Sequence, residues 1–105
     1  MQAVARRVHG AILLVLVARG ETLASRVGLT VSRKVGGAVV RNRVKRWLRE
    51  AVRAVGTPAG GPWDLVLVAR ADAAKAGYAA VEAQVRHLFH REVPSRLGRA
   101  GGGVP

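Results

Sequence analysis

Three apolar runs along the chain have the pattern expected of buried strands. The runs cover residues 11–18, 26–32 and 64–69. Each is rich in valine and leucine and is bounded by glycine or polar residues, which predicts strands of one sheet rather than helices. A basic segment at 2–8 precedes the first run, and we expect it to add a short strand at the edge of the same sheet.

Two later segments change to the period of an amphipathic helix. Between residues 38 and 55 the apolar side chains recur at steps of three and four, and a stretch rich in glycine and proline ends the pattern. A second pattern of this kind covers 78 to about 91. Pro94 and the glycine-rich tail at 98–105 then predict the end of ordered structure. We therefore expect a single domain over residues 1–97, followed by a flexible tail.

The first apolar run also imitates a secretory signal peptide, because Arg6 and Arg7 precede it. It has only eight residues, lacks the small-residue cleavage pattern and meets Arg19 directly. A buried strand explains it better, and no stretch of the chain is long enough to span a bilayer. The chain has no cysteine, which excludes disulfides and cysteine-based metal sites and fits a cytoplasmic location.

The charge of the chain is strongly unbalanced. Eighteen lysines and arginines stand against six acidic residues, which gives a formal charge of +12. Half of the residues are hydrophobic, so the chain has the composition of a folded domain rather than of a basic disordered tail. Positive charges in such excess repel one another in the compact state, which predicts a polyanionic partner. Nucleic acid is the leading candidate for this partner, and an anionic membrane surface is the second.

The cations concentrate in one part of the chain. Residues 33–53 contain eight of the eighteen. With Arg41 as zero and about 100° per residue, the apolar side chains of the helix fall between roughly 240° and 20°, and Arg43 stands apart near roughly 200°. The other polar side chains share the adjoining face, up to about 140° from Arg41: Arg41, Asn42, Lys45, Arg46, Arg49 and Arg53. Solvated helix faces usually mix both signs of charge, so this face predicts binding to a phosphate backbone.

Candidate catalytic groups are few. The six acidic residues are scattered, and no two are spaced to form a metal or acid–base pair on one element. His87 and His90 lie one helical turn apart and could hold a metal or act as base and acid, but no carboxylate or cysteine is placed in the sequence to join them. We expect them to face solvent or RNA, and we predict neither a catalytic residue nor a metal site in this chain.

One block of the sequence resembles a known family. Residues 26–53, RVGLTVSRKVGGAVVRNRVKRWLREAVR, are similar to the signature block of the bacterial ribonuclease P protein subunit, in which a strand, a basic turn and an Arg-Asn-Arg helix follow in this order. The likeness continues through residues 63–74 and the closing helix, and covers roughly residues 5–91. The Arg-Asn-Arg triplet, the Ser-Arg-Lys turn before it and the Lys-Arg pair after it match together, which makes the resemblance specific.

The resemblance implies a fold that periodicity alone does not give. It is a two-layer sandwich of the α+β or α/β class, in which a small mixed sheet of four strands packs on two helices. The family connects the strands at 26–32 and 64–69 through a left-handed crossover, whereas the general rule for parallel strands predicts a right-handed one. Relatives normally begin with a further basic and aromatic helix, and this sequence starts close to where that helix would end. Either the start of the sequence is truncated or the helix is absent, and in the second case the bared sheet surface would favour self-association.

The resemblance also implies a function. Family members bind a large catalytic RNA and the 5′ leader of precursor tRNA, and they help the RNA remove the leader with Mg²⁺ ions. The chain would thus be a subunit of an endoribonuclease whose catalysis belongs to the RNA, without a tightly bound cofactor of its own. The open face of the sheet would form the leader cleft, with Leu13 and Val15 as candidate lining residues. The residues implied in RNA binding are Arg33, Lys34, Arg41, Asn42, Arg43, Lys45, Arg46, Arg49 and Arg53.

Other functions stay open from the sequence. A structural RNA-binding protein, such as a ribosomal or assembly protein, would carry the same charge and bind RNA without any effect on processing. DNA binding is disfavoured, because a recognition helix needs base-reading side chains on a protruding face and this helix shares its surface with the core.

Overall fold

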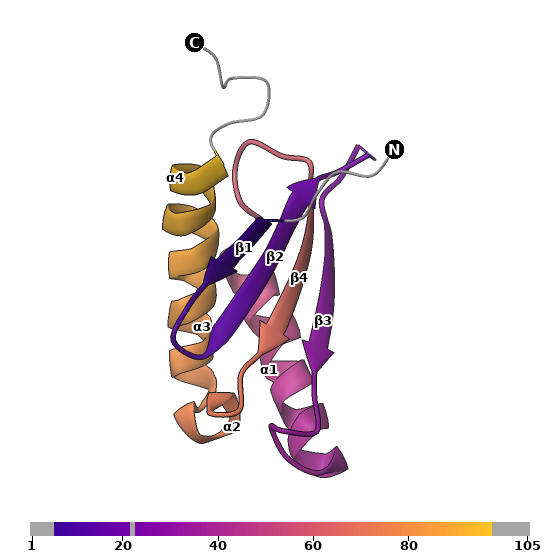
Figure 1. Ribbon diagram of the computed structural model, residues 1–105, viewed down its shortest axis with the longest axis vertical. Coiled ribbons are helices and arrows are strands. Elements are labelled where there is room, and N and C mark those ends of the chain that lie inside the picture. The colour runs from indigo at the N-terminus through magenta and orange to yellow at the C-terminus, as the bar shows by residue number, and fades with distance from the viewer. Residues whose placement is uncertain (1–5, 22, 98–105) are drawn as a thin grey trace.

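The computed structural model describes residues 6–21 and 23–97, which form a four-stranded sheet covered on one face by helices (Figure 1). The strands follow the spatial order β1-β2-β4-β3. Their bounds are Arg6–His9 for β1, Leu13–Arg19 for β2, Arg26–Val31 for β3 and Trp63–Ala69 for β4. The helices are α1 at Ala38–Val55, α2 at Ala73–Ala76, α3 at Tyr78–His87 and α4 at Val93–Leu97, with the π-helical turn η1 at Leu88–Glu92 between the last two.

The sheet is mixed, as the family resemblance implied. β2 pairs antiparallel with both β1 and β4, whereas β3 and β4 are parallel and are joined through α1. In Figure 1, β3 and β4 run in the same direction and α1 lies behind them, so that the connection turns left-handed. The predicted fold class is confirmed, including the edge strand of the basic N-terminal segment, of which residues 2–5 lie outside the described part of the chain.

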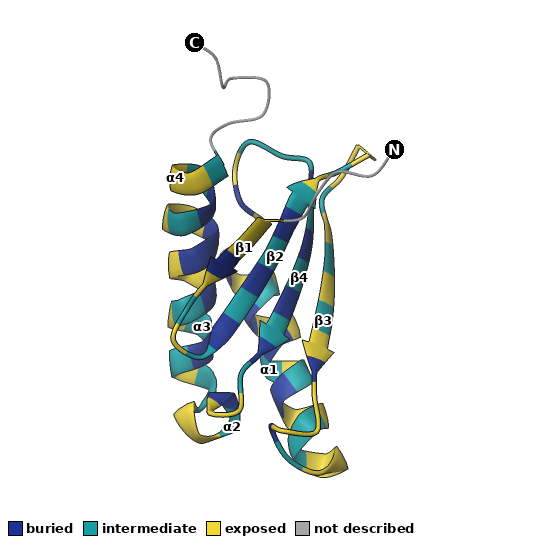
Figure 2. Cartoon of the chain, viewed as in Figure 1, coloured by how far each residue is buried: buried dark blue, intermediate teal, exposed yellow. Residues whose placement is uncertain are grey.

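The core lies between the sheet and the helices. Alternate residues of the central strands are fully buried on this side, and the others form the open face, as the banding of β2 and β4 shows in Figure 2. From α1 the core receives Val44, Leu48 and Ala51, which recur at helical spacing. Trp63 and Phe89 are its largest side chains, and both are completely buried. The core therefore fixes which face of α1 remains outside.

The C-terminal helical segment is longer than predicted. The helical pattern predicts an end at about Arg91, whereas the helical backbone continues through Pro94 to Leu97. In the π-turn the backbone N–H of Val93 donates to the carbonyl of Leu88, which shifts the hydrogen-bonding pattern by one residue. Pro94 thereby falls in the first turn of α4, where the missing N–H of proline costs little. The predicted flexible tail at 98–105 lies outside the described residues.

A side chain from α3 holds the hairpin between β1 and β2. The Oε1 atom of Gln84 accepts hydrogen bonds from the backbone N–H groups of Ile12 and Leu13, at 2.7 and 3.2 Å. The hairpin lies so close that a Cβ atom at Gly10 would stand 2.5 Å from the same Oε1. These contacts tie the β1 edge of the sheet to α3 across more than 70 residues of sequence.

We expect Gln84→Ala to lower the free energy of unfolding by about 2 kcal/mol, because it leaves two partly buried N–H donors without a protein acceptor. Chemical denaturation would measure the change. Gln84→Glu keeps an acceptor oxygen at the same reach and should lose less stability than the alanine variant. Equal losses in the two variants would contradict a hydrogen-bonding role for Gln84.

Candidate nucleic-acid interface

α1 separates an apolar face from a cationic one. Its buried residues are Val44, Leu48, Ala51 and Val55. The helix ends at Val55, where Gly56 adopts a φ angle of 82° that a residue with a side chain would rarely take. The predicted site residues of α1 lie on the other side, with Arg41 and Lys45 half-buried at the border and these five exposed: Asn42, Arg43, Arg46, Arg49 and Arg53.

A groove of about 460 Å³ runs along the exposed side of α1. It is lined by Val39, Asn42, Arg43, Arg46 and Arg49. The expectation that Arg43 stands apart from the other cations is wrong, because Arg43 lines this groove together with Arg46, one turn further along. Residues three apart are neighbours on a helix surface, and a long arginine side chain spans the remaining angle between them. The groove therefore presents three guanidinium groups and one amide to a single ligand.

The cationic surface continues from α1 toward the edge of the sheet. A second, smaller groove is lined by Val27 and Leu29 of β3 and by Arg49, Val52 and Arg53 of α1. Since Arg49 lines both grooves, the two form one surface along the helix and its border with β3. We call the surface of these two grooves the α1 surface. An extended polyanion fits such a surface better than a small compact ligand does.

The turn between β3 and α1 carries the two remaining predicted cations. Arg33 and Lys34 are exposed. The backbone N–H of Lys34 donates to the Ser32 hydroxyl at 3.3 Å, and that of Val35 to the Ser32 carbonyl at 3.1 Å. Val35 is buried, and a Cβ atom at Gly36 would lie 2.8 Å from a methyl group of Val40. The turn is thus fixed at both ends, and it holds Arg33 and Lys34 beside the start of α1.

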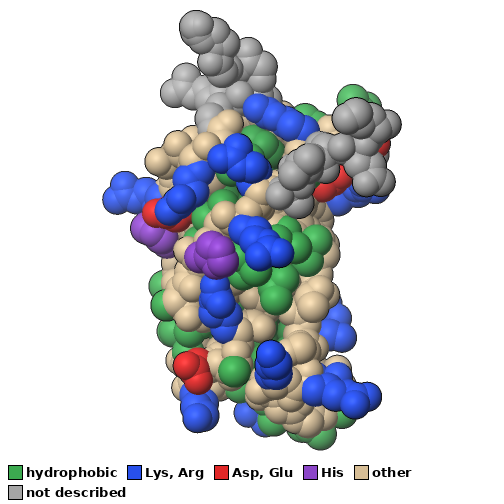
Figure 3. Space-filling model, in the orientation of Figure 1, with side chains coloured by type: hydrophobic (Ala, Val, Ile, Leu, Met, Phe, Trp, Pro, Cys, Tyr) green, Lys and Arg blue, Asp and Glu red, His purple; other side chains and the backbone are tan. Residues whose placement is uncertain are grey.

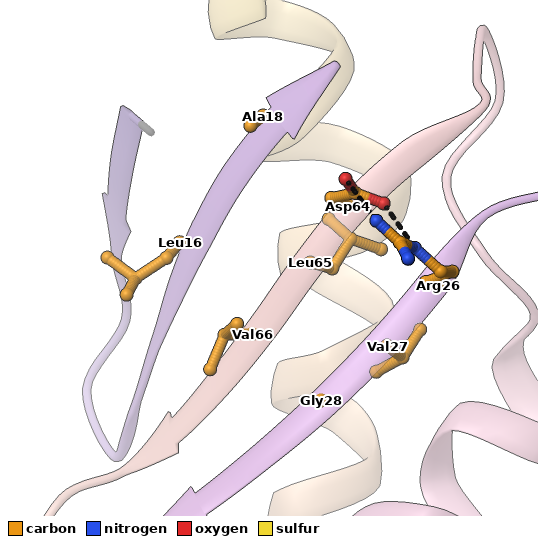
Figure 4. Close-up of a pocket in the computed structure, with 8 residues that line it drawn as sticks. All are labelled: Leu16, Ala18, Arg26, Val27, Gly28, Asp64, Leu65 and Val66. Carbon is orange, nitrogen blue, oxygen red and sulfur yellow. Dashed lines mark hydrogen bonds and ion pairs between the residues drawn. The ribbon is translucent and has the colours of Figure 1, made fainter. Parts of the chain in front are cut away.

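The open face of the sheet has an apolar centre with basic side chains around it (Figure 3). A shallow pocket lies at its β3 side, between residues of β2, β3 and β4 (Figure 4). The pocket residues with side chains on this face include Leu16 and Ala18 of β2 and Val66 of β4. Arg26 of β3 and Asp64 of β4 stand opposite one another at one end. The face is therefore neither wholly apolar nor wholly cationic.

The prediction that Leu13 and Val15 line the cleft is wrong. Both are completely buried on the helix side of the sheet. Side chains alternate between the two faces of a strand, so an error of one position selects the opposite face. The residues that follow each of them in β2, Leu14 and Leu16, are opposite Val68 and Val66 of β4 on the open face.

Arg26 and Asp64 form a bidentate ion pair that sequence reasoning missed. The Nε and Nη2 atoms of Arg26 each lie 3.0 Å from an oxygen of the Asp64 carboxylate. The hydrogen bond from Arg26 lowers the pKa of Asp64 below its ordinary value. The pair depends on the parallel register of β3 and β4, so no local pattern in the sequence could have revealed it.

Aromatic side chains contribute little to the open face. Trp63 and Phe89 are buried in the core, and Trp47 and Tyr78, on α1 and α3, pack at its border. Arg19 lies over the Trp63 ring, 4.5 Å from its centre. These four residues are all the Phe, Trp and Tyr side chains of the sequence, so none of these rings can stack on a nucleotide base at this face. The aromatic ring that the face does carry is the exposed imidazole of His9, which is opposite Leu14.

One of the two histidines of the last helix, His87, does meet a carboxylate, contrary to the sequence-based expectation. Nε2 of His87 lies 3.1 Å from Oε2 of Glu92, and Oε1 of Glu92 accepts a hydrogen bond from Nε of Arg96 at 2.9 Å. Residues five apart diverge on an α-helix, but the π-turn between them brings them together. Within residues 6–21 and 23–97, no group of three or more His, Asp or Glu side chains could hold a metal ion. No helix in that part of the chain is long and apolar enough to cross a membrane.

Comparison with known proteins gives one consistent family. The model of the family described as Ribonuclease P matches residues 2–93. Among curated relatives, the ribonuclease P protein component of Dehalococcoides mccartyi strain 195 is 56% identical over 65 residues, which are 62% of this chain and 52% of the relative. That of Bacillus cereus strain B4264 is 39% identical over 72 residues, 69% of this chain and 63% of the relative. The chain thus matches between about half and two thirds of the length of these relatives.

Solved structures agree with these sequence matches. The RNase P protein from Thermotoga maritima, in complex with a fluorophenyl thiourea, superimposes with a TM-score of 0.73 at 26% identity, covering 83% of this chain and 85% of that one. The RNase P protein of Staphylococcus aureus gives a TM-score of 0.71 at 26% identity, over 79% of this chain and 76% of the other.

Proposed function

Because the chain belongs to the ribonuclease P protein family, we propose that it acts as the protein subunit of a ribonuclease P. In this role it binds the catalytic RNA and the 5′ leader of precursor tRNA in the cytoplasm, and it assists the endonucleolytic removal of the leader. The observation that carries the proposal is the α1 surface, where cations predicted from the sequence line two adjoining grooves. The catalytic RNA is the partner that we assign to this surface.

The chemistry of the α1 surface supports a phosphate ligand. Guanidinium groups offer planar, permanently charged donors that match phosphate oxygens in pairs. Arg41 adds a further donor at the border, because its Nε is buried and has no hydrogen-bond partner within the described part of the chain. Reorientation of the Arg41 guanidinium toward a phosphate would remove this unfavourable state. The turn with Arg33 and Lys34 extends the same surface beyond the start of α1.

The open face of the sheet is the proposed contact for the leader. Leu14, Leu16 and Val66 offer apolar surface for the bases, and nearby arginines offer charge for the phosphates. Leucine and valine pack against a base but do not stack as rings do, so we expect this contact to add less affinity than the α1 surface does. Cleavage itself is assigned to the RNA, with Mg²⁺ bound there, and the protein supplies binding and orientation.

A reconstitution experiment tests the proposed function. The full chain is mixed with the ribonuclease P RNA of the same organism and a precursor tRNA at low Mg²⁺ concentration, and release of the leader is measured. We expect cleavage only when both chain and RNA are present, and faster than with the RNA alone. Binding to the RNA without any gain in cleavage would favour a structural RNA-binding protein. Equal affinity for random duplex DNA and for the RNA would show a non-specific binder of polyanions.

A further inference from the structure

A third groove lies on the outer side of the C-terminal helical segment. It has a volume of about 430 Å³ and is lined by Ala83, Arg86, His87, His90 and Arg91. The four polar side chains are exposed, and they come from α3 and η1. In Figure 3, histidine, basic and acidic side chains lie together on the upper left flank, beside the helical segment that Figure 1 shows from α3 to α4. We call this the α3 groove.

The packing of the segment explains why these residues share one side. Val81, Val85, Leu88 and Phe89 are buried against the sheet and α1. The residues of the α3 groove recur at steps of three and four between them, which places them together on the opposite side. The π-turn adds one residue and returns Val93 to the buried side, so the exposed side is not interrupted where η1 begins. Local π-turns in helices are frequently found at functional positions.

Ion pairs leave part of the α3 groove available to a ligand. Glu82 accepts a hydrogen bond from Arg86 at 2.7 Å, and Glu92 is shared between His87 and Arg96. Among residues 6–21 and 23–97, no side chain forms a hydrogen bond or an ion pair with His90 or Arg91. One guanidinium and one imidazole in the groove thus keep their donors for an external acceptor.

The α3 groove and the α1 surface lie on different flanks of the molecule. α3 lies beneath the β1 side of the sheet, where Gln84 holds the β1–β2 hairpin, whereas the smaller groove of the α1 surface opens beside β3, at the other end of the strand order. A ligand segment that fills one groove therefore leaves the other open.

We propose that the α3 groove binds the phosphate backbone of a second RNA segment, separate from the segment bound by the α1 surface. Ala83 is the single apolar residue of its lining, so the groove lacks the large apolar anchors on which protein partners depend. Arg86, His90 and Arg91 offer N–H donors suited to phosphate oxygens, and small Ala83 lets a backbone approach closely. This inference rests on the proposed RNA-binding function, and the segment belongs either to the catalytic RNA or to precursor tRNA.

The test uses His90→Ala/Arg91→Ala, which leaves intact the contacts of Arg86 with Glu82 and of His87 and Arg96 with Glu92. Affinity is measured separately for the catalytic RNA and for precursor tRNA over a series of salt concentrations near neutral pH. We expect affinity for one of the two RNAs to fall roughly threefold to tenfold, and the slope of log affinity against log salt to flatten by about 0.7–0.9. Lys75→Ala removes one exposed cation from α2 and should change neither value.

Footprinting of the bound RNA against hydroxyl radicals identifies the segment. The His90→Ala/Arg91→Ala variant should lose protection of one segment and keep the segment that Arg43→Ala/Arg46→Ala loses. Wild-type affinity and slope for both RNAs, or loss of the same segment in both variants, would overturn the proposal. If the wild-type chain restores cleavage and the His90→Ala/Arg91→Ala variant matches it in every measurement, this inference fails and the proposed function stands. A wild-type chain that binds neither RNA overturns both.

Discussion

Arg43→Ala/Arg46→Ala should weaken binding of the catalytic RNA by roughly 100-fold, or about 1.4 kcal/mol for each arginine. Both side chains line the groove on α1, both are exposed, and neither belongs to the core. The slope of log affinity against log salt should flatten by roughly 1.4–1.8, because each phosphate contact releases counterions on binding and the variant makes two fewer such contacts. Filter binding or fluorescence anisotropy over a salt series measures both quantities.

A charge-conserving pair of substitutions is the matched control. Arg43→Lys/Arg46→Lys keeps the two positive charges and removes the paired donors of the guanidinium groups, so it should keep most of the salt slope and lose only part of the affinity. Thermal unfolding of the alanine variant should stay close to wild type, since exposed substitutions of this kind usually change stability by less than about 0.5 kcal/mol. Unfolding at a much lower temperature would show that the arginines support the fold, and it would contradict their assignment to RNA binding. Arg41 is a less suitable probe because it is half-buried.

The elements of the fold could be predicted because each has a local cause. α1 was predicted at 38–55 and observed at Ala38–Val55, since its apolar side chains keep one helical period between two glycine-containing turns. The strands were found because short apolar runs end at glycine or at charged residues. The order and direction of the strands are not local properties. The left-handed connection through α1 came from the family resemblance alone, and the general rule for parallel strands would have given the opposite hand.

The residues of the leader cleft show where local reasoning stops. The run that forms β2 is apolar at nearly every position, so it lacks the polar alternation that would distinguish the core face from the open face. In β4, the charge of Asp64 indicates which residues face outward. Val66 lies two positions further along the strand, so it belongs to the same open face. To decide which residues of β2 lie on the same face, one also needs the antiparallel register of β2 and β4, in which Leu16 is opposite Val66. The sequence of β2 alone does not contain this register, and Leu13 and Val15 belong to the core.

The cationic surface was easier to predict than the cleft. Helical spacing places Asn42, Arg46 and Arg49 together whatever the tertiary structure, and their charge excludes them from the core. The α3 groove was predictable only in part. Helical spacing places His87 and His90 on one exposed side, but the contact between His87 and Glu92 depends on the π-turn. That π-turn follows from how Leu88, Phe89 and Val93 all reach the core rather than from residue type.

Leu48→Ala should produce the largest loss of stability among the α1 variants, roughly 3 kcal/mol. Leu48 is completely buried between α1 and the sheet, and removal of a buried leucine leaves a cavity that the core fills only in part. A loss of this size is a large share of the roughly 5–15 kcal/mol that stabilises a typical domain, and in a chain of this length it lowers the midpoint of thermal unfolding by roughly 10–25 °C. Circular dichroism during heating and urea denaturation measure the two quantities.

Val39→Ala is the control within the same helix. Val39 is 75% exposed, so its truncation should change the free energy of unfolding by less than about 0.5 kcal/mol. At temperatures where Leu48→Ala is still folded, its salt slope for RNA binding should equal that of wild type, because the variant keeps every cation of the α1 surface. Similar stability of the Leu48 and Val39 variants would contradict the docking of α1 through its Leu48 face. The packing of the Leu48 face on the sheet is what leaves Arg43 and Arg46 exposed on the other side of α1. Similar stability of the two variants would therefore also remove the structural basis of the α1 surface.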